Sequence, residues 1–199
     1  MKALEEKILQ EGEVVDGDIL KVDGFVNHQV DALLMEEIGK DMAEHFKGQG
    51  ITKVFTIESS GIAPALFTVK DIISPAIFVL ESEPIRMILK KQQTADSLKT
   101  EVWQTEVVSY TKDTSYRLTL AKNYISDEDH VLIVDDFLAN GEAATGAIRL
   151  IRKAHATVAG LGVLIEKAFQ PGREKLESQG IHVYAQASIK AFENGKVVF

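Results

Sequence analysis

The sequence contains no cysteine among its 199 residues. A chain without cysteine cannot form a disulfide, a zinc site with thiolate ligands or a cysteine nucleophile. The N-terminal residues 1–7 are charged rather than apolar, so they do not resemble a signal peptide, and no later apolar run is long enough to cross a bilayer. We therefore expect a cytoplasmic protein.

Positive charge is also scarce, since 22 lysine and arginine residues stand against 30 aspartate and glutamate residues and the net charge is −8. Proteins that bind nucleic acids in general need a basic surface, so a nucleic acid is not an expected partner. A membrane is not expected either, because the sequence has no apolar run long enough to cross one. A local basic pocket for a small phosphorylated molecule is still allowed. The sequence has no repeats, low-complexity tracts or flexible linkers, and its length suits one domain.

Short apolar strands alternate with helices along the chain. The continuous apolar run Val131–Val134 is typical of a strand buried on both faces, and Asp31 is placed to cap a helix. Such alternation predicts an α/β fold with a parallel sheet covered by helices on both faces. The expected strands are 53–57, 76–80, 131–134, 158–165, 183–185 and 197–199; the expected helices are 2–11, about 32–47, 62–70, 141–154 and 171–179; residues 102–110 and 117–121 should form a hairpin, and residues 19–25 a loop or an edge strand.

The most informative segment runs from Val131 to Gly146, where an apolar strand ends in Asp135 and Asp136 and small residues lead into a helix. Ligands of open α/β sheets bind beyond the carboxyl ends of the strands. Two carboxylates there can accept hydrogen bonds from two sugar hydroxyls, and the free N–H groups that open the next helix can bind a phosphate. The segment therefore suits a ribose 5-phosphate, although two adjacent acids alone fit a simple helix cap equally well.

The whole segment resembles the phosphoribosyl pyrophosphate signature of type I phosphoribosyltransferases. By this resemblance, Asp135 and Asp136 are the catalytic pair and hold the ribose hydroxyls. The loop implied to cradle the 5-phosphate consists of Ala139, Asn140, Gly141, Glu142 and Ala143. Many members have a second glycine in place of Glu142 and serine or threonine in place of Ala143. Because a carboxylate should repel a phosphate, we expect Glu142 to point outward or toward metal-bound water.

Further stretches are similar to those of bacterial xanthine phosphoribosyltransferases, from the N-terminal helix to Phe199 with one interruption. They are residues 20–23, 27–29, 50–53, 56–65, 136–141, 165–167 and 169–173. The resemblance implies a type I phosphoribosyltransferase fold, a twisted sheet with a parallel core and helices on both faces. It also implies a single domain, 1–199, that forms a homodimer and carries a small hood over the base, built from about residues 12–30 and the part after residue 167.

The same resemblance implies an enzyme of purine salvage. It would transfer the 5-phosphoribosyl group from phosphoribosyl pyrophosphate to xanthine, which gives xanthosine 5′-monophosphate and pyrophosphate. Mg²⁺ is expected as a cofactor bound through phosphoribosyl pyrophosphate, without a metal site on the protein itself.

Four consecutive residues after the strand 53–57 match the loop that receives pyrophosphate in this family. They are Glu58, Ser59, Ser60 and Gly61. Hydroxyl groups and backbone N–H groups at the start of a helix favour an anion, which agrees with that role. For the tetrapeptide alone, a plain turn between strand and helix is the simpler interpretation.

The resemblance also implies three residues that contact the base, Leu20, Asn27 and Lys167, and Phe169 is a candidate for stacking on it. Asn27 offers both a donor and an acceptor to the edge of a purine dione, and Lys167 can donate to a 6-oxo group. Three of these residues have an ordinary alternative: Asn27 could be a turn residue, Lys167 a solvated lysine paired with Glu166, and Phe169 part of the core.

One segment, from Glu81 to about Thr100, does not match the family, whose members usually carry a flexible catalytic loop there. Lys90 and Lys91 could supply the cation of that loop. Other interpretations stay open: a hypoxanthine, guanine or adenine transferase, a non-catalytic regulator that senses phosphoribosyl pyrophosphate, or a nucleotide- or methyl-donor-binding enzyme. The regulator would need a DNA-binding module, for which this short, acidic chain has no room. The nucleotide- or methyl-donor-binding enzyme would need a glycine-rich loop after its first strand, which the sequence lacks.

Overall fold

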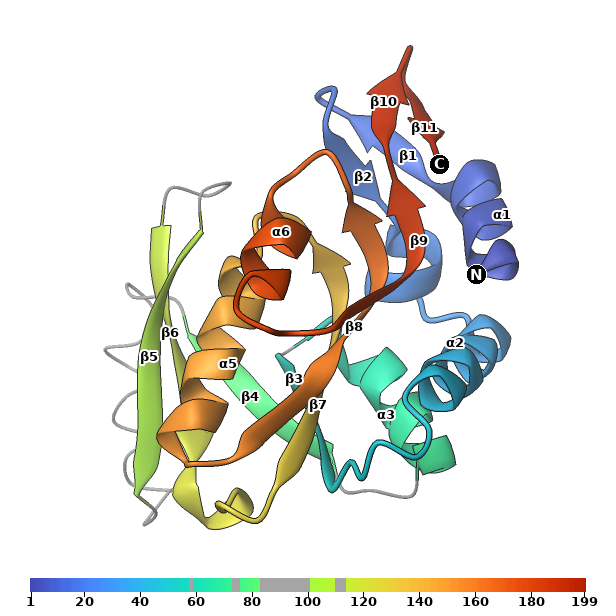
Figure 1. The fold of residues 1–199 in the computed structure, drawn as a ribbon. Coiled ribbons are helices and arrows are strands. Elements are labelled where there is room, and N and C mark those ends of the chain that lie inside the picture. The colour runs from blue at the N-terminus through green and yellow to red at the C-terminus, as the bar shows by residue number, and fades with distance from the viewer. Residues whose placement is uncertain (58, 73–75, 83–100, 110–113) are drawn as a thin grey trace.

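The computed structural model describes the backbone of residues 1–57, 59–72, 76–82, 101–109 and 114–199. A seven-stranded sheet in the order β5-β6-β4-β3-β7-β8-β9 forms its centre (Figure 1). The strands are β3 (Lys53–Ile57), β4 (Ala76–Ser82), β5 (Val102–Ser109), β6 (Thr114–Ala121), β7 (His130–Leu138), β8 (Thr157–Lys167) and β9 (Val183–Ile189). From β4 to β9 all neighbours pair parallel, and the hairpin β5–β6 adds to the edge at β4 in the antiparallel sense. The predicted α/β class is confirmed.

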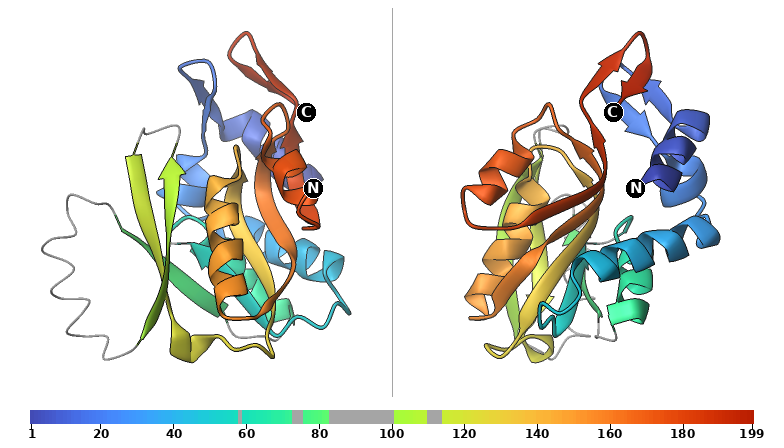
Figure 2. Two further views of the ribbon diagram at one scale, coloured as in Figure 1. Left: turned by 60° about the vertical axis from the view of Figure 1, so that its left-hand side comes forward. Right: turned by 45° about the vertical axis from the view of Figure 1, so that its right-hand side comes forward.

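Helices cover both faces of this sheet. On one face lie α2 (Ala32–His45) and α3 (Ile62–Ile72), and on the other lie α5 (Glu142–Lys153) and the short α6 (Gly172–Glu177) (Figure 2). Asp31 caps α2 as expected, since its Oδ1 accepts a hydrogen bond from the Leu34 amide at 3.1 Å. Ile148 and Ile151 of α5 are buried against the strands, as their spacing predicts.

The strand β7 is longer than its apolar run predicts. Its pairing with β8 continues past Val134, with Asp135 opposite Val163 and Leu138 opposite Glu166. The two acidic residues therefore belong to the strand itself. Polar residues that follow an apolar run predict a loop when the sequence alone is considered. The strand nevertheless continues here, because its length is set by backbone pairing with the neighbouring strand and not by these side chains.

Segments from both ends of the chain form a second layer beside the sheet. This layer, which we call the terminal layer, consists of α1 (Lys2–Glu11), the hairpin of β1 (Glu13–Val15) with β2 (Ile19–Lys21), one π-helical turn (Asp23–Asn27), and the hairpin of β10 (Ala191–Glu193) with β11 (Lys196–Val198). Its apolar residues share a core with Leu164, Ile165 and Ile189, which belong to β8 and β9. Figures 1 and 2 show the layer above the ends of these strands.

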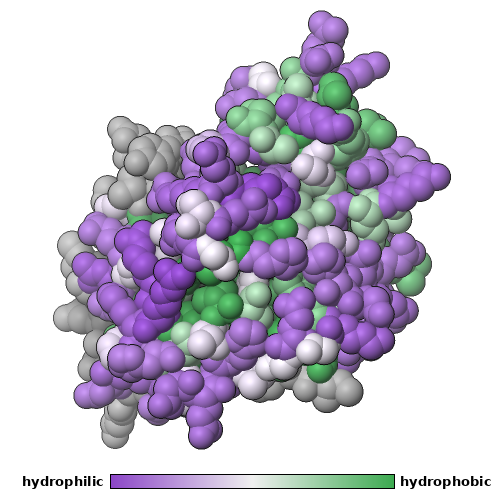
Figure 3. Space-filling model, in the orientation of Figure 1, coloured by the Kyte–Doolittle hydropathy of each residue, from purple (hydrophilic) through white to green (hydrophobic). Residues whose placement is uncertain are grey.

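The outer surface is mostly hydrophilic on the face drawn in Figure 3, where apolar residues emerge mainly near the terminal layer and in the middle of the face. This agrees with a chain of which 26% is charged. Within the described ranges, no helix has the length and apolar character needed to span a bilayer.

Candidate active site

The carboxyl end of β7 brings two acidic side chains to the edge of the sheet. Asp135 is 8% exposed, and its Oδ1 accepts a hydrogen bond from the Asp136 amide at 3.1 Å. Oδ1 of Asp136 in turn accepts one from the Phe137 amide at 3.0 Å. Burial raises the pKa of Asp136, while hydrogen bonds from the Phe137 amide and the Ser60 side chain act in the opposite direction. The pair is thus held by backbone groups that fix the direction of both carboxylates.

The loop before α3 lies directly against this pair. A Cβ atom added to Gly61 would lie 2.2 Å from Oγ1 of Thr56 and 3.2 Å from Oδ1 of Asp135, so only glycine fits there. Ser60 reaches Asp136 with its side chain, and Ser59 lies exposed beside it. The structure therefore brings two residues of the predicted pyrophosphate loop, Ser60 and Gly61, to the acidic pair. The fourth residue of that loop, Glu58, lies outside the described residues, as do Lys90 and Lys91.

The predicted phosphate loop joins β7 to α5. Gly141 has a φ of +76°, which favours glycine, and its carbonyl accepts from the amide of Thr145 at 2.9 Å and from its Oγ1 at 2.6 Å. These are the first bonds of the helix, so the amides of Glu142 and Ala143 have no helical acceptor. Across the described chain, the amides of residues 140–143 donate to no other protein group. The loop thus has free donors at a helix N-terminus, as an anion site requires.

The short helix α6 supports this loop from the side. The amide of Gly172 donates to the carbonyl of Ala139 at 3.1 Å. A Cβ atom added to Gly172 would lie 2.2 Å from that oxygen, and one added to Gly141 would lie 3.3 Å from the Cα of Gly172. The two backbones therefore touch, and the shape of the loop depends on α6.

Glu142 does not have the surroundings expected from the sequence. We expected its side chain to point outward or toward metal-bound water, but its Oε1 lies 2.6 Å from Nζ of Lys175 on α6. The physical reason is that α6 places a lysine beside the first turn of α5, a tertiary contact between residues 33 positions apart. The loop's carboxylate is consequently neutralised by the protein.

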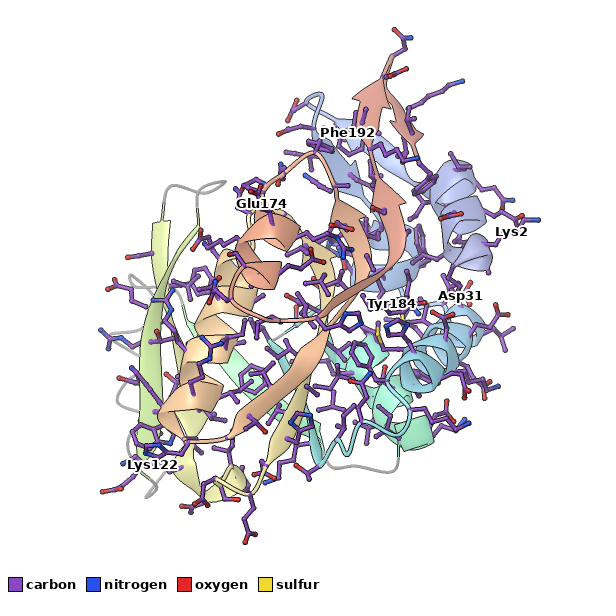
Figure 4. The ribbon with its side chains drawn as sticks, in the orientation of Figure 1. Lys2, Asp31, Lys122, Glu174, Tyr184 and Phe192 are labelled. Carbon is purple, nitrogen blue, oxygen red and sulfur yellow. The ribbon has the colours of Figure 1, made fainter. Side chains whose placement is uncertain are left out.

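Lys167 is the last residue of β8 and lies beneath the terminal layer. Its Nζ donates to the carbonyl of Asp18, between β1 and β2, at 2.6 Å, and lies 5.9 Å from the ring centroid of Phe192. Burial lowers the pKa of Lys167, and the negative charge of Asp18 opposes this shift. Phe169 is 45% exposed and meets Phe192 edge to face at 5.6 Å; Figure 4 labels Phe192. A cation and two aromatic rings thus gather at this end of β8.

The two other predicted base contacts belong to the terminal layer. Leu20 is 6% exposed and packs inside the layer. Asn27 ends the π-helical turn and is exposed. In the part of the chain that the structure describes, no hydrogen bond joins either residue to Lys167.

An ion pair beside Lys167 was missed at the level of sequence. Lys167 was considered as a partner of Glu166, but Glu166 is 2% exposed and binds Arg173 instead, with Nε to Oε1 and Nη2 to Oε2 both at 2.7 Å. Ser188 also donates to Oε2 at 3.0 Å. An arginine shortly after a strand-ending glutamate was the available signal, but a sequence alone does not reveal that the glutamate is buried.

A protein-held metal centre has few candidate ligands. Within the described ranges, no group of three or more histidine, aspartate or glutamate side chains is arranged to hold an ion. Mg²⁺ that is bound chiefly by phosphate oxygens and water needs only one or two carboxylates from the protein. Asp135 and Asp136 fit that donor set, since both are carboxylates at the strand end.

Known proteins resemble this chain in sequence and in fold. Xanthine phosphoribosyltransferase of Agathobacter rectalis is 51% identical over 199 residues, 100% of this chain and 98% of the relative. Xanthine phosphoribosyltransferase 1 of Clostridium botulinum is 50% identical over 199 residues, 100% of this chain and 99% of the relative.

Two solved structures that resemble the chain are more distant in sequence. Adenine phosphoribosyltransferase from Thermoanaerobacter pseudethanolicus superimposes with a TM-score of 0.72 at 18% identity, covering 93% of this chain and 99% of that one. The enzyme from Giardia lamblia in complex with 9-deazaadenine gives 0.73 at 16% identity, covering 93% and 97%. At this identity the likeness concerns the fold alone. The phosphoribosyl transferase domain profile matches residues 28–192, so the chain belongs to the phosphoribosyltransferase family.

Proposed function

We propose that the protein is a xanthine phosphoribosyltransferase of purine salvage, which converts xanthine and phosphoribosyl pyrophosphate into xanthosine 5′-monophosphate and pyrophosphate. The observation that carries the proposal is the meeting of Asp135 and Asp136 with two anion-binding loops, one ending in Gly61 and one in Ala143. Relatives 45–51% identical over the whole chain bear that enzyme name, which supports xanthine as the base.

The arrangement suits displacement of pyrophosphate at the anomeric carbon of the ribose. Asp135 and Asp136 would accept hydrogen bonds from the two ribose hydroxyls, and the free amides of residues 140–143 would bind the 5-phosphate. Ser59, Ser60 and Gly61 would hold the pyrophosphate next to the same acids. Mg²⁺, when bound to the substrate, neutralises part of the pyrophosphate charge. The protein's own part is to orient both reactants and to exclude water.

The purine would lie between the end of β8 and the terminal layer, which we propose is the hood. Lys167 would give up its bond to the Asp18 carbonyl and donate to the 6-oxo group of the base. Phe169 offers an exposed ring for stacking, and the Asn27 amide offers a donor to the 2-oxo group. For Leu20 the backbone is the part left to contact the base, because its side chain is buried.

The family resemblance carries three further proposals. The protein would form a homodimer, act in the cytoplasm and require Mg²⁺ bound through phosphoribosyl pyrophosphate. Measurement of the molecular size in solution tests the homodimer. Measurement of activity with and without a chelator tests the requirement for Mg²⁺.

The function is tested by offering phosphoribosyl pyrophosphate and Mg²⁺ with xanthine, hypoxanthine, guanine, adenine or uracil. We expect the highest kcat/KM with xanthine. Preference for another purine would overturn the choice of base alone, whereas absence of transfer to every base would overturn the proposed enzyme.

A further inference from the structure

The helix α6 contributes a lysine to the loop that is proposed to bind the 5-phosphate. We propose that Lys175 is a positioning residue for this reaction: by pairing with Glu142, it keeps the amides at the start of α5 available to the phosphate. This inference rests on the proposed function, because it assigns a role within the same site.

Glu142 creates a difficulty for the loop. It is the first residue of α5, and the N-terminus of a helix attracts any anion through its partial positive charge and its free N–H groups. An unpaired carboxylate there would compete with the phosphate for those donors and would also repel it. A phosphate carries up to two negative charges, so the repulsion would be felt at several ångströms.

The structure shows where that carboxylate lies instead. Its Oε1 is 2.6 Å from Nζ of Lys175, and both side chains are largely covered, with exposed fractions of 23% for Glu142 and 35% for Lys175. In the described part of the chain, the Glu142 side chain bonds to this lysine and not to a helix amide. The pair removes the net charge beside the loop and turns the carboxylate toward α6.

The position of Lys175 is itself fixed. Its amide donates to the carbonyl of Pro171 at 3.0 Å, and the neighbouring Gly172 is bonded to the Ala139 carbonyl of the phosphate loop. On the other side of α6, Arg173 holds Glu166, the residue before Lys167. The same short helix therefore orders the phosphate loop and the strand end that carries the proposed base-binding lysine. A lysine on such an element needs little reorganisation to hold its partner.

The test is a double-mutant comparison with xanthine and phosphoribosyl pyrophosphate as substrates. Lys175→Met removes the positive charge and leaves Glu142 unpaired, so the KM for phosphoribosyl pyrophosphate should rise about tenfold while the KM for xanthine changes little. The rise should shrink as ionic strength increases, because salt screens the repulsion between the unpaired carboxylate and the phosphate. Adding Glu142→Gln to Lys175→Met should return the KM toward that of the unmodified protein.

The matched control is Lys47→Met. Lys47 forms a comparable pair with Glu44 at 3.0 Å, but both side chains are 72% exposed and lie at the end of α2. We expect no change in either KM. If Lys175→Met does not fold, as judged by thermal unfolding, Lys175→Gln provides the same loss of charge.

The outcomes separate the inference from the function on which it rests. Without transfer to xanthine by the unmodified protein, the proposed function itself fails. If that protein is active but Lys175→Met leaves the KM for phosphoribosyl pyrophosphate unchanged, the inference is wrong. It is also wrong if Glu142→Gln does not restore the KM, because Lys175 would then bind the phosphate directly or act only in packing.

Discussion

Arg173 donates two parallel hydrogen bonds to Glu166, Nε to Oε1 and Nη2 to Oε2, each 2.7 Å long. Because Glu166 is 2% exposed, loss of the guanidinium would leave a buried carboxylate with Ser188 as its remaining donor of those described. We expect Arg173→Met to lower the free energy of unfolding by roughly 2 kcal/mol, below the full cost of breaking a buried pair because Arg173 is partly exposed. Urea unfolding measures it, and Arg152→Met, at an exposed arginine of α5, is the control.

The acidic pair of β7 should decide the binding of phosphoribosyl pyrophosphate. Changing Asp135→Asn together with Asp136→Asn removes two charged acceptors, each worth about 1.5–3 kcal/mol, so kcat/KM should fall by at least about 100-fold. Circular dichroism should show an intact fold. The double change Asp127→Asn with Glu128→Gln alters the net charge equally at two exposed positions and should leave activity intact. Unchanged affinity for phosphoribosyl pyrophosphate in the first variant would refute the assignment.

Two glycines with the same backbone conformation allow the phosphate loop to be tested. Gly141 and Gly180 both have a φ of +76°, so valine at either position should lower the free energy of unfolding by about 1–2 kcal/mol. A Cβ atom at Gly180 meets nothing within 4 Å, whereas at Gly141 it lies 3.3 Å from Gly172. Steady-state kinetics should therefore show a raised KM for phosphoribosyl pyrophosphate in Gly141→Val alone. Equal kinetic effects of the two variants would contradict the proposed role of the loop.

The choice of base should depend on Asn27 and not on Lys167. Asn27→Asp replaces a donor by an acceptor, which leaves the 2-oxo group of xanthine unpaired at a cost of about 1–3 kcal/mol and favours the 2-amino group of guanine. Lys167→Ala should weaken xanthine, hypoxanthine and guanine alike, because all three share the 6-oxo group. Specificity constants for the three bases measure both effects, with Asn123→Asp as an exposed control. An unaltered ranking in Asn27→Asp would place selectivity elsewhere.

One histidine, at the end of α2, should make stability depend on pH. Nε2 of His45 lies 2.9 Å from Nε2 of His182 with ring planes within 9°, and Tyr184, labelled in Figure 4, stacks on His45 at 3.7 Å. Burial, followed by the charge of His182, lowers the pKa of His45, although Asp41 acts against this. The unfolded chain then binds a proton at His45 more readily than the folded protein does. The contribution of His45 to the free energy of unfolding is therefore fully present above about pH 6.5, and it is lost as the pH falls through the folded pKa.

Urea unfolding at about pH 7.5 and about pH 5.5 measures this dependence. His45→Asn should reduce the loss of stability between the two conditions. His155→Asn is the control, because His155 is exposed and asparagine tolerates its φ of +62°. If both variants keep the slope of the unmodified protein, the histidine pair does not cause it.

The elements that the sequence predicts well are those whose signal is local. The strand Lys53–Ile57 has the predicted bounds because its apolar run ends at polar residues on both sides, and α2 begins at its predicted cap, Asp31. The hairpin of β5 and β6 also follows from alternation within each strand. The acidic pair was found for the same reason, since strand, acids and small-residue loop are consecutive in the chain.

What the sequence does not predict depends on partners distant in the chain. The strands of the two small hairpins, β1–β2 and β10–β11, have only three residues each, too few for a period to be recognised. The pairing of Glu142 with Lys175 and the burial of Glu166 arise from the packing of α6, which no local pattern encodes. The atypical segment 81–100, apart from the backbone of residues 81 and 82, lies outside the described residues.

The terminal layer has a consequence for the order in which the protein acquires its parts during synthesis. Its N-terminal elements α1 and β1 contact β11, more than 180 residues later. A ribosome that has completed β7 and α5 has made the acids and the phosphate loop, but β9 and β11, which both contact the first helix, do not yet exist. Joining segments so far apart carries a loop-closure cost and is slow. Once α6, which supports the phosphate loop, has also been made, we expect newly made chains to gain affinity for phosphoribosyl pyrophosphate before they gain affinity for a purine.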